Sequence, residues 1–244
     1  MDRHNMKKSI YILPNLFTSM NLVCGYYAIT ASMQMRFVEA GVAILVGAIF
    51  DLLDGKIARA TNTTSKFGIE YDSLADLVTF GLAPALLMYQ WGLIDAGRPG
   101  WSAALLFTLC GALRLARFNT ASSDHPDFEG LPIPSAAAMV VSVVLFFARL
   151  DMNPQPYKLV FLVMMFVLSF CMVSSFRYKS LKKVSLTKSM NFSKLVGLIL
   201  IIVLVATEPS ILLFFVFLLY VVSGPVLSLI SHALHRTGQQ TQGR

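Results

Sequence analysis

The sequence predicts an all-α protein, a polytopic membrane bundle of about eight transmembrane helices. Hydrophobic residues make up 56% of the 244-residue chain, and the mean hydropathy is +0.66. Charged residues make up only 14%, which is too few to cover the surface of a soluble domain of this length. The apolar residues also gather in runs close to the ~20 residues that a helix needs to cross a bilayer.

Polar segments that carry Pro and Gly separate these runs, for example DAGRPG, SSDHPDFEG and DMNPQPY. The length fits one helical bundle and leaves no room for a separate soluble catalytic domain. The predicted spans are residues 14–33, 37–60, 68–92, 100–120, 132–150, 157–176, 192–207 and 210–233.

The net charge of +7 comes from basic residues that lie between the apolar runs. Anionic lipid headgroups therefore explain the charge better than nucleic acid does. All Lys and Arg residues except Arg36, Arg98, Arg149 and Lys158 fall on one side of the predicted topology. The positive-inside rule then places both termini on the cytoplasmic side. The expected location is the cytoplasmic (inner) membrane. The basic segment 177–191 is read equally well as a solvated loop or as an amphipathic helix on the leaflet.

Four aspartates lie at the cytoplasmic ends of the second and third predicted spans. Asp51 and Asp54 are three residues apart and Asp72 and Asp76 are four apart, so each pair shares one face of its helix. A short polar link makes the two helices antiparallel neighbours, and their acidic faces can converge. Charged residues inside spans are costly and usually mark function.

Four adjacent carboxylates repel one another unless a cation holds them. Carboxylate oxygens suit Mg²⁺ or Mn²⁺, and the absence of a His or Cys cluster in the sequence disfavours zinc. Gly55 and Gly68 would allow a ligand to approach the backbone, Arg59 suits a phosphate, and Ser65 offers a hydroxyl. The sequence therefore predicts a metal-assisted diphosphate site, and ordinary helix-end charges are the weaker explanation.

At these residues the chain resembles the CDP-alcohol phosphatidyltransferase family, whose signature is D-x2-D-G-x2-A-R-x8-G-x3-D-x3-D. The match is complete in residue type and spacing. The resemblance implies a six-helix catalytic core, two divalent ions bound by the aspartates, and Asp76 as general base. It also implies that Gly55, Arg59 and Ser65 contact the diphosphate of a CDP-lipid. The matching positions are Asp51, Asp54, Gly55, Ala58, Arg59, Gly68, Asp72 and Asp76.

Three further segments resemble the serine-accepting bacterial and archaeal branch of this family: PNLFTSMNLVCG (14–25), RLARFN (114–119) and GLPIPSAA (130–137). In the first segment, Pro14, Asn15 and Thr18 either contact the cytosine or simply cap the helix. In the second, Arg114, Arg117 and Asn119 either hold the acceptor carboxylate or anchor the cytoplasmic end of the span. In the third, Pro132 and Pro134 would free backbone groups to line a cavity.

We therefore expect the phosphatidyl group of CDP-diacylglycerol to be transferred directly to the hydroxyl of L-serine, giving phosphatidylserine and CMP. Glycerol 3-phosphate or an inositol phosphate is the alternative acceptor within the family. A divalent-cation transporter and a non-catalytic lipid-binding protein are the other classes. Confinement of the acidic cluster to one end of the spans disfavours a transporter. The intact aspartate motif disfavours a non-catalytic protein.

The expected partners are CDP-diacylglycerol, L-serine and membrane lipids. The resemblance also makes a homodimer a possible assembly, since dimers are common in the family. No span shows a clear dimer face. The expected organisation is a cytoplasmic N-terminal segment (1–13), the catalytic core (14–176), the basic segment (177–191), two additional spans (192–233) and a cytoplasmic tail (234–244).

Overall fold

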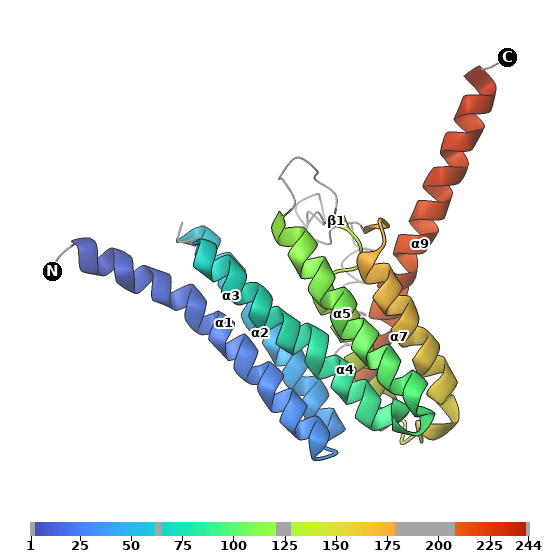
Figure 1. The fold of residues 1–244 in the computed structure, drawn as a ribbon, viewed down its shortest axis with the longest axis horizontal. Helices are drawn as coiled ribbons and strands as arrows, with labels where there is room; N and C mark the ends of the chain where they lie inside the picture. Colours follow the sequence, from blue (N-terminus) through green and yellow to red (C-terminus); the bar gives the residue numbers. More distant parts are fainter. Residues whose placement is uncertain (1–2, 62–64, 121–127, 179–207, 243–244) are drawn as a thin grey trace, which may run out of the picture.

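The computed structural model describes residues 3–61, 65–120, 128–178 and 208–242. These residues form a helical bundle with one very short strand pair, so the predicted all-α membrane fold is confirmed (Figure 1). The helices that follow one another at the N-terminus are α1 (Arg3–Met33), α2 (Phe37–Ala60) and α3 (Lys66–Asp76). The remaining long helices are α5 (Arg98–Thr120), α6 (Ile133–Arg149), α7 (Lys158–Val173) and α9 (Pro209–Gln242).

The sequence predicted a third span over residues 68–92, and in the structure this span is not a uniform α-helix. α3 runs directly into a π-helical segment, η1 (Leu77–Leu82), then into α4 (Ala83–Met88) and a second π-helical segment, η2 (Tyr89–Leu93). A 3₁₀ turn, η3 (Ile94–Ala96), ends the span. Pro84 at the start of α4 lacks a backbone N–H, which helps to explain why the regular hydrogen-bond ladder is interrupted here.

Four of the described helical segments are long and apolar enough to cross a membrane: Lys66–Ala96, Arg98–Thr120, Gln155–Val173 and Pro209–Ser228. α6 is apolar but shorter. α1 begins at Arg3, well before the predicted start of the first span, and continues through Pro14. The predicted span 192–207 lies outside the described residues, as does most of the basic segment 177–191.

Three helices cross closely beside the acidic end of the bundle. A Cβ added at Gly25 of α1 would lie 2.9 Å from the Cα of Thr79 in η1, and one at Gly47 of α2 would lie 2.7 Å from its Cγ2. The hydroxyl of Thr79 donates to the carbonyl of Asn21 at 2.9 Å. Only glycine allows backbones to approach this closely, so the two glycines hold α1 and α2 against the third span.

The segment that leads into α6 is fixed against the end of α7. β1 (Phe128–Glu129) pairs antiparallel with β2 (Arg177–Tyr178). The N–H of Gly130 donates to the carbonyl of Phe176, and the N–H of Leu131 donates to that of Cys171, both at 2.9 Å. Gly130 has a φ of +82°, and a side chain there would collide with the Met172 carbonyl. This docking sets where the first turn of α6 begins.

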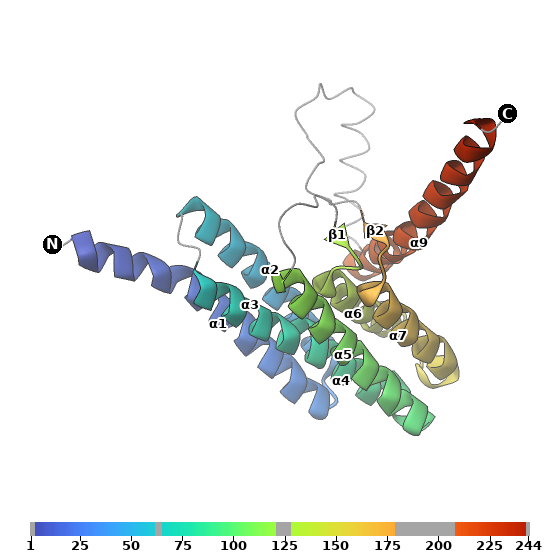
Figure 2. The ribbon, with the colours of Figure 1, turned by 45° about the horizontal axis from the view of Figure 1, so that its top comes forward.

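The last helix, α9, packs along α6 before extending away from the bundle (Figure 2). The rings of Phe146 and Phe214 stack with centroids 4.7 Å apart. At its start, Glu208 accepts two hydrogen bonds from Arg149, at 2.8 Å and 2.6 Å. These hydrogen bonds lower the pKa of the exposed Glu208 carboxyl. The paired guanidinium and carboxylate fix the position of α9 against the end of α6.

Candidate active site

Three aspartates converge where α2 meets α3. Asp51 of α2 and Asp72 and Asp76 of α3 each offer a carboxylate oxygen, and the three oxygens lie within 4.8 Å of one another. Asp72 and Asp76 are one helical turn apart, which is why both face α2. Asp76 is the most deeply buried of the three, with 8% of its surface exposed.

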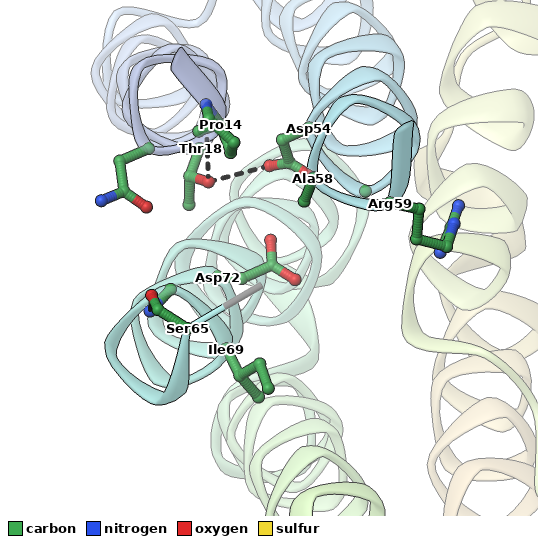
Figure 3. Close-up of a pocket in the computed structure, with 11 residues that line it drawn as sticks. Pro14, Thr18, Asp54, Ala58, Arg59, Ser65, Ile69 and Asp72 are labelled. Carbon is green, nitrogen blue, oxygen red and sulfur yellow. Dashed lines mark hydrogen bonds between the residues drawn. The ribbon is translucent and has the colours of Figure 1, made fainter. Parts of the chain in front are cut away.

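Asp54, the remaining aspartate of the motif, lies beside this group and is held by α1. Its Oδ2 accepts a hydrogen bond of 2.9 Å from the hydroxyl of Thr18, which also contacts the carbonyl of Pro14 at 3.2 Å (Figure 3). Asp54 is only 3% exposed. Thr18 was expected to contact the CDP-lipid or to cap the helix. In the structure it orients a carboxylate of the acidic cluster.

The donor set fits a divalent metal. The Oδ1 atom of Asp72 is buried and has no hydrogen-bond partner in the structure. A buried carboxylate oxygen without a partner is costly, and the oxygens of Asp51 and Asp76 lie within reach of the same point. A hard cation coordinated by oxygens would satisfy all three groups. The described residues therefore contain a cluster that could hold a metal ion.

Asn21 of α1 is a site residue that sequence reasoning missed. Its Nδ2 donates to Oδ1 of Asp76 at 2.9 Å, and the residue is completely buried. Its own Oδ1 is buried without a partner, and its backbone carbonyl accepts the Thr79 hydrogen bond. The signal was an amide in the middle of an apolar run, which is costly unless it has a partner. Spacing along the chain could not supply that partner, because it lies on a different helix.

We expect Asn21→Ala to lower the turnover number without abolishing binding of the lipid substrate. A hydrogen bond to a charged group contributes about 1.5–3 kcal/mol, so the loss corresponds to roughly 10- to 100-fold in rate if Asp76 loses its orientation. The measurement is steady-state CMP release from purified protein. Thr30→Ala is the matched control on α1, because it removes a side-chain hydrogen bond to Tyr27 away from the site. Equal rates for Asn21→Ala and the unchanged protein would contradict the assigned role.

A pocket opens beside the aspartates between α1, α2 and α3 (Figure 3). All seven residues predicted to bind the CDP-lipid line it, together with Asp54, Ala58, Ile69 and Asp72. The seven are Pro14, Asn15, Thr18, Gly55, Arg59, Ser65 and Gly68.

Two polar side chains of this pocket, those of Ser65 and Arg59, have different surroundings. The Ser65 hydroxyl caps α3 by accepting a hydrogen bond of 3.0 Å from the N–H of Gly68. A Cβ at Gly68 would lie 3.1 Å from that hydroxyl, so the glycine keeps the turn open. Arg59 is exposed at the rim, and its guanidinium extends away from Asp72 (Figure 3). The pocket thus has an acidic inner wall and a cationic side chain at its edge.

The five residues predicted for the acceptor pocket differ in their surroundings. The Asn119 amide donates to the Ser73 hydroxyl at 3.0 Å and to Glu70 at 3.4 Å, so it clamps α5 to α3. Arg117 is exposed. Pro132 precedes α6, where its carbonyl accepts from two N–H groups of the first turn, and Pro134 lies within that turn.

Arg114 differs from the other four. It is partly buried in α5, and its Nε is buried without a hydrogen-bond partner. The guanidinium interacts electrostatically with Asp76 and with Tyr220 of α9. Arg114 therefore lies within electrostatic range of Asp76 in the acidic cluster.

Comparison with known proteins agrees with this site. A model of the CDP-alcohol phosphatidyltransferase family matches residues 11–174. The CDP-diacylglycerol–serine O-phosphatidyltransferase of Helicobacter pylori (strain 26695) is 45% identical over 180 residues, which cover 72% of this chain and 75% of that protein. The enzyme of the same name from Bacillus subtilis is 40% identical over 129 residues, 53% of this chain and 73% of that protein. The archaetidylserine synthase of Methanothermobacter thermautotrophicus is 35% identical over 174 residues, 70% of each chain.

Proposed function

The chain belongs to the CDP-alcohol phosphatidyltransferase family, and from that premise we propose that it transfers the phosphatidyl group of CDP-diacylglycerol to the hydroxyl of L-serine. The products are phosphatidylserine and CMP. The observation that carries the proposal is the convergence of Asp51, Asp72 and Asp76 beside the pocket between α1, α2 and α3. The names of relatives from bacteria and an archaeon support serine as the acceptor.

The pocket residues bind and orient the nucleotide lipid. Its rim carries Arg59, which can donate to phosphate oxygens, and its floor includes Gly55 and Gly68, which leave the backbone accessible. The pocket is also lined by Pro14, Asn15, Thr18 and Ser65. The exposed apolar faces of the helices suit lipid tails, so the lipid chains can remain in the bilayer while the diphosphate occupies the pocket.

The four aspartates would hold one or two divalent ions, Mg²⁺ or Mn²⁺. When bound, such an ion supplies Lewis-acid stabilisation of the charge on the diphosphate oxygens. Asp76 accepts the proton of the serine hydroxyl, and the amide of Asn21 holds that carboxylate in place. The oxygen of serine then forms a bond to the phosphorus that carries diacylglycerol, and the bond from that phosphorus to CMP breaks. Positioning and electrostatics provide most of the acceleration in such transfers.

We also propose that the site faces the cytoplasm. This orientation is favoured by the basic residues that flank the acidic ends of the spans, such as Lys56, Arg59 and Lys66. We assign catalysis to residues 14–176, and treat 192–233 as additional spans and 234–244 as a tail. A homodimer remains a hypothesis for this chain.

The direct test offers purified protein, in detergent, CDP-diacylglycerol and a divalent metal with each acceptor in turn. We expect CMP release and a new aminophospholipid with L-serine. CMP release with glycerol 3-phosphate or inositol phosphate, and none with serine, would replace serine as the acceptor. No CMP release with any of these alcohols would overturn the proposed function.

A further inference from the structure

A second polar group interacts with Asp76 and shares no residue with the lining of the lipid-binding pocket. Arg114 of α5 interacts electrostatically with both Asp76 and Tyr220. Its Nε is buried and has no hydrogen-bond partner in the structure. A guanidinium presents its Nε and one terminal nitrogen as a fork that matches the two oxygens of a carboxylate. An unsatisfied Nε therefore leaves this fork available to a ligand.

Tyr220 reaches this position from α9. It is partly buried, and its hydroxyl shares a hydrogen bond with the side chain of Ser135. Ser135 lies in the first turn of α6, directly after Pro134, and its N–H donates to the carbonyl of Pro132 at 3.0 Å. The docking of Gly130 and Leu131 against α7 fixes this turn. The phenol is thus oriented by a rigid element and lies within electrostatic range of Arg114.

We propose that Tyr220 determines acceptor specificity, forming with Arg114 and Ser135 a subsite for the carboxylate of the acceptor. The proposal rests on the proposed function, and it deepens that function by naming residues that recognise the amino acid. Arg114 interacts electrostatically with Asp76, so a carboxylate held in the subsite would bring the neighbouring hydroxyl of the same small molecule toward the base. A phenol and a guanidinium both donate to an anion, whereas nothing in this trio carries a negative charge.

Tyr220 lies outside the segment that matches the family model. The family match ends at residue 174, and α9 begins at Pro209. The aspartates, which perform the transfer, lie within the matched segment, and Tyr220 lies beyond it. The last helix therefore contributes to the choice of acceptor and not to the transfer itself.

The test is the Tyr220→Phe variant, which keeps the ring and removes only the hydroxyl. We expect the KM for L-serine to rise roughly tenfold or more, as for loss of one hydrogen bond to a charged group. The KM for CDP-diacylglycerol and the metal requirement should stay unchanged. Preference for L-serine over serinol, which lacks the carboxylate, should fall by a similar factor. Ser135→Ala should move the same ratio in the same direction.

Tyr157→Phe is the control, because Tyr157 precedes α7 and packs on Phe147 and Phe161. It should leave all of these constants unchanged. An unchanged KM for L-serine in Tyr220→Phe would overturn the proposal. So would equal losses with L-serine and serinol accompanied by a lower Tm, which would indicate a packing role. Absence of CMP release by the unchanged protein would instead overturn the proposed function.

Discussion

The Asp76→Asn variant is expected to bind CDP-diacylglycerol as the unchanged protein does and to turn over roughly 10²- to 10⁴-fold more slowly, the range that a positioned base contributes. The asparagine has nearly the same shape and can keep the contact with Asn21 after a flip of one amide. It cannot accept the proton of the serine hydroxyl. The loss should therefore appear in kcat, with little change in the KM for the lipid.

Two measurements distinguish a role of Asp76 as the general base from a purely structural role. Lipid binding is measured by equilibrium titration, and turnover by CMP release at saturating serine. Asp95→Asn is the matched control, because Asp95 lies in η3 at the other end of the same helical span and is exposed. Full activity of Asp76→Asn would remove Asp76 from the mechanism. Loss of lipid binding together with activity would assign Asp76 to the architecture of the pocket.

Removal of divalent metal is expected to abolish CMP release, by at least roughly a thousandfold, because a Lewis acid supplies several kcal/mol of charge stabilisation. Adding Mg²⁺ or Mn²⁺ back should restore the activity. The physical reason is the set of carboxylate oxygens from Asp51, Asp72 and Asp76, which lie within 4.8 Å of one another. Asp72→Asn should raise the metal concentration needed for half-maximal activity, since its Oδ1 has no other partner.

The control for this experiment is thermal stability in the presence of the chelator. If the protein stays folded and inactive, and activity returns with added metal, the ion acts in the reaction. CMP release that persists after exhaustive chelation would show that the carboxylates do not act through a metal.

Much of this site follows from local spacing. The intervals between Asp51 and Asp54 and between Asp72 and Asp76 match the helical repeat, so each pair had to share a face. The short link between the helices then brings the faces together. The family resemblance, with Ser65 of the link, identified every residue that lines the lipid pocket except Ile69.

Other features depend on contacts between helices that spacing does not encode. Asn21 meets Asp76 across 55 positions of the chain. Tyr220 hydrogen-bonds with Ser135, and interacts electrostatically with Arg114, because α9 packs on α6. Asn119 belongs to a quoted sequence segment, yet its amide joins α5 to α3 through Ser73. Sequence patterns indicate which faces are polar, but packing determines which polar faces meet.

The π-helical segment after Asp76 has a consequence for how this protein tolerates changes in length. Each residue added to a helix rotates everything beyond it by about 100°. The wide turns over Leu77–Leu82 therefore set the angle between the carboxylates of α3 and the buried surface of α4. Deleting one residue there would swing the aspartates out of alignment without removing any functional side chain. Homologous sequences should consequently show no insertions or deletions in this stretch, even where its residue types differ.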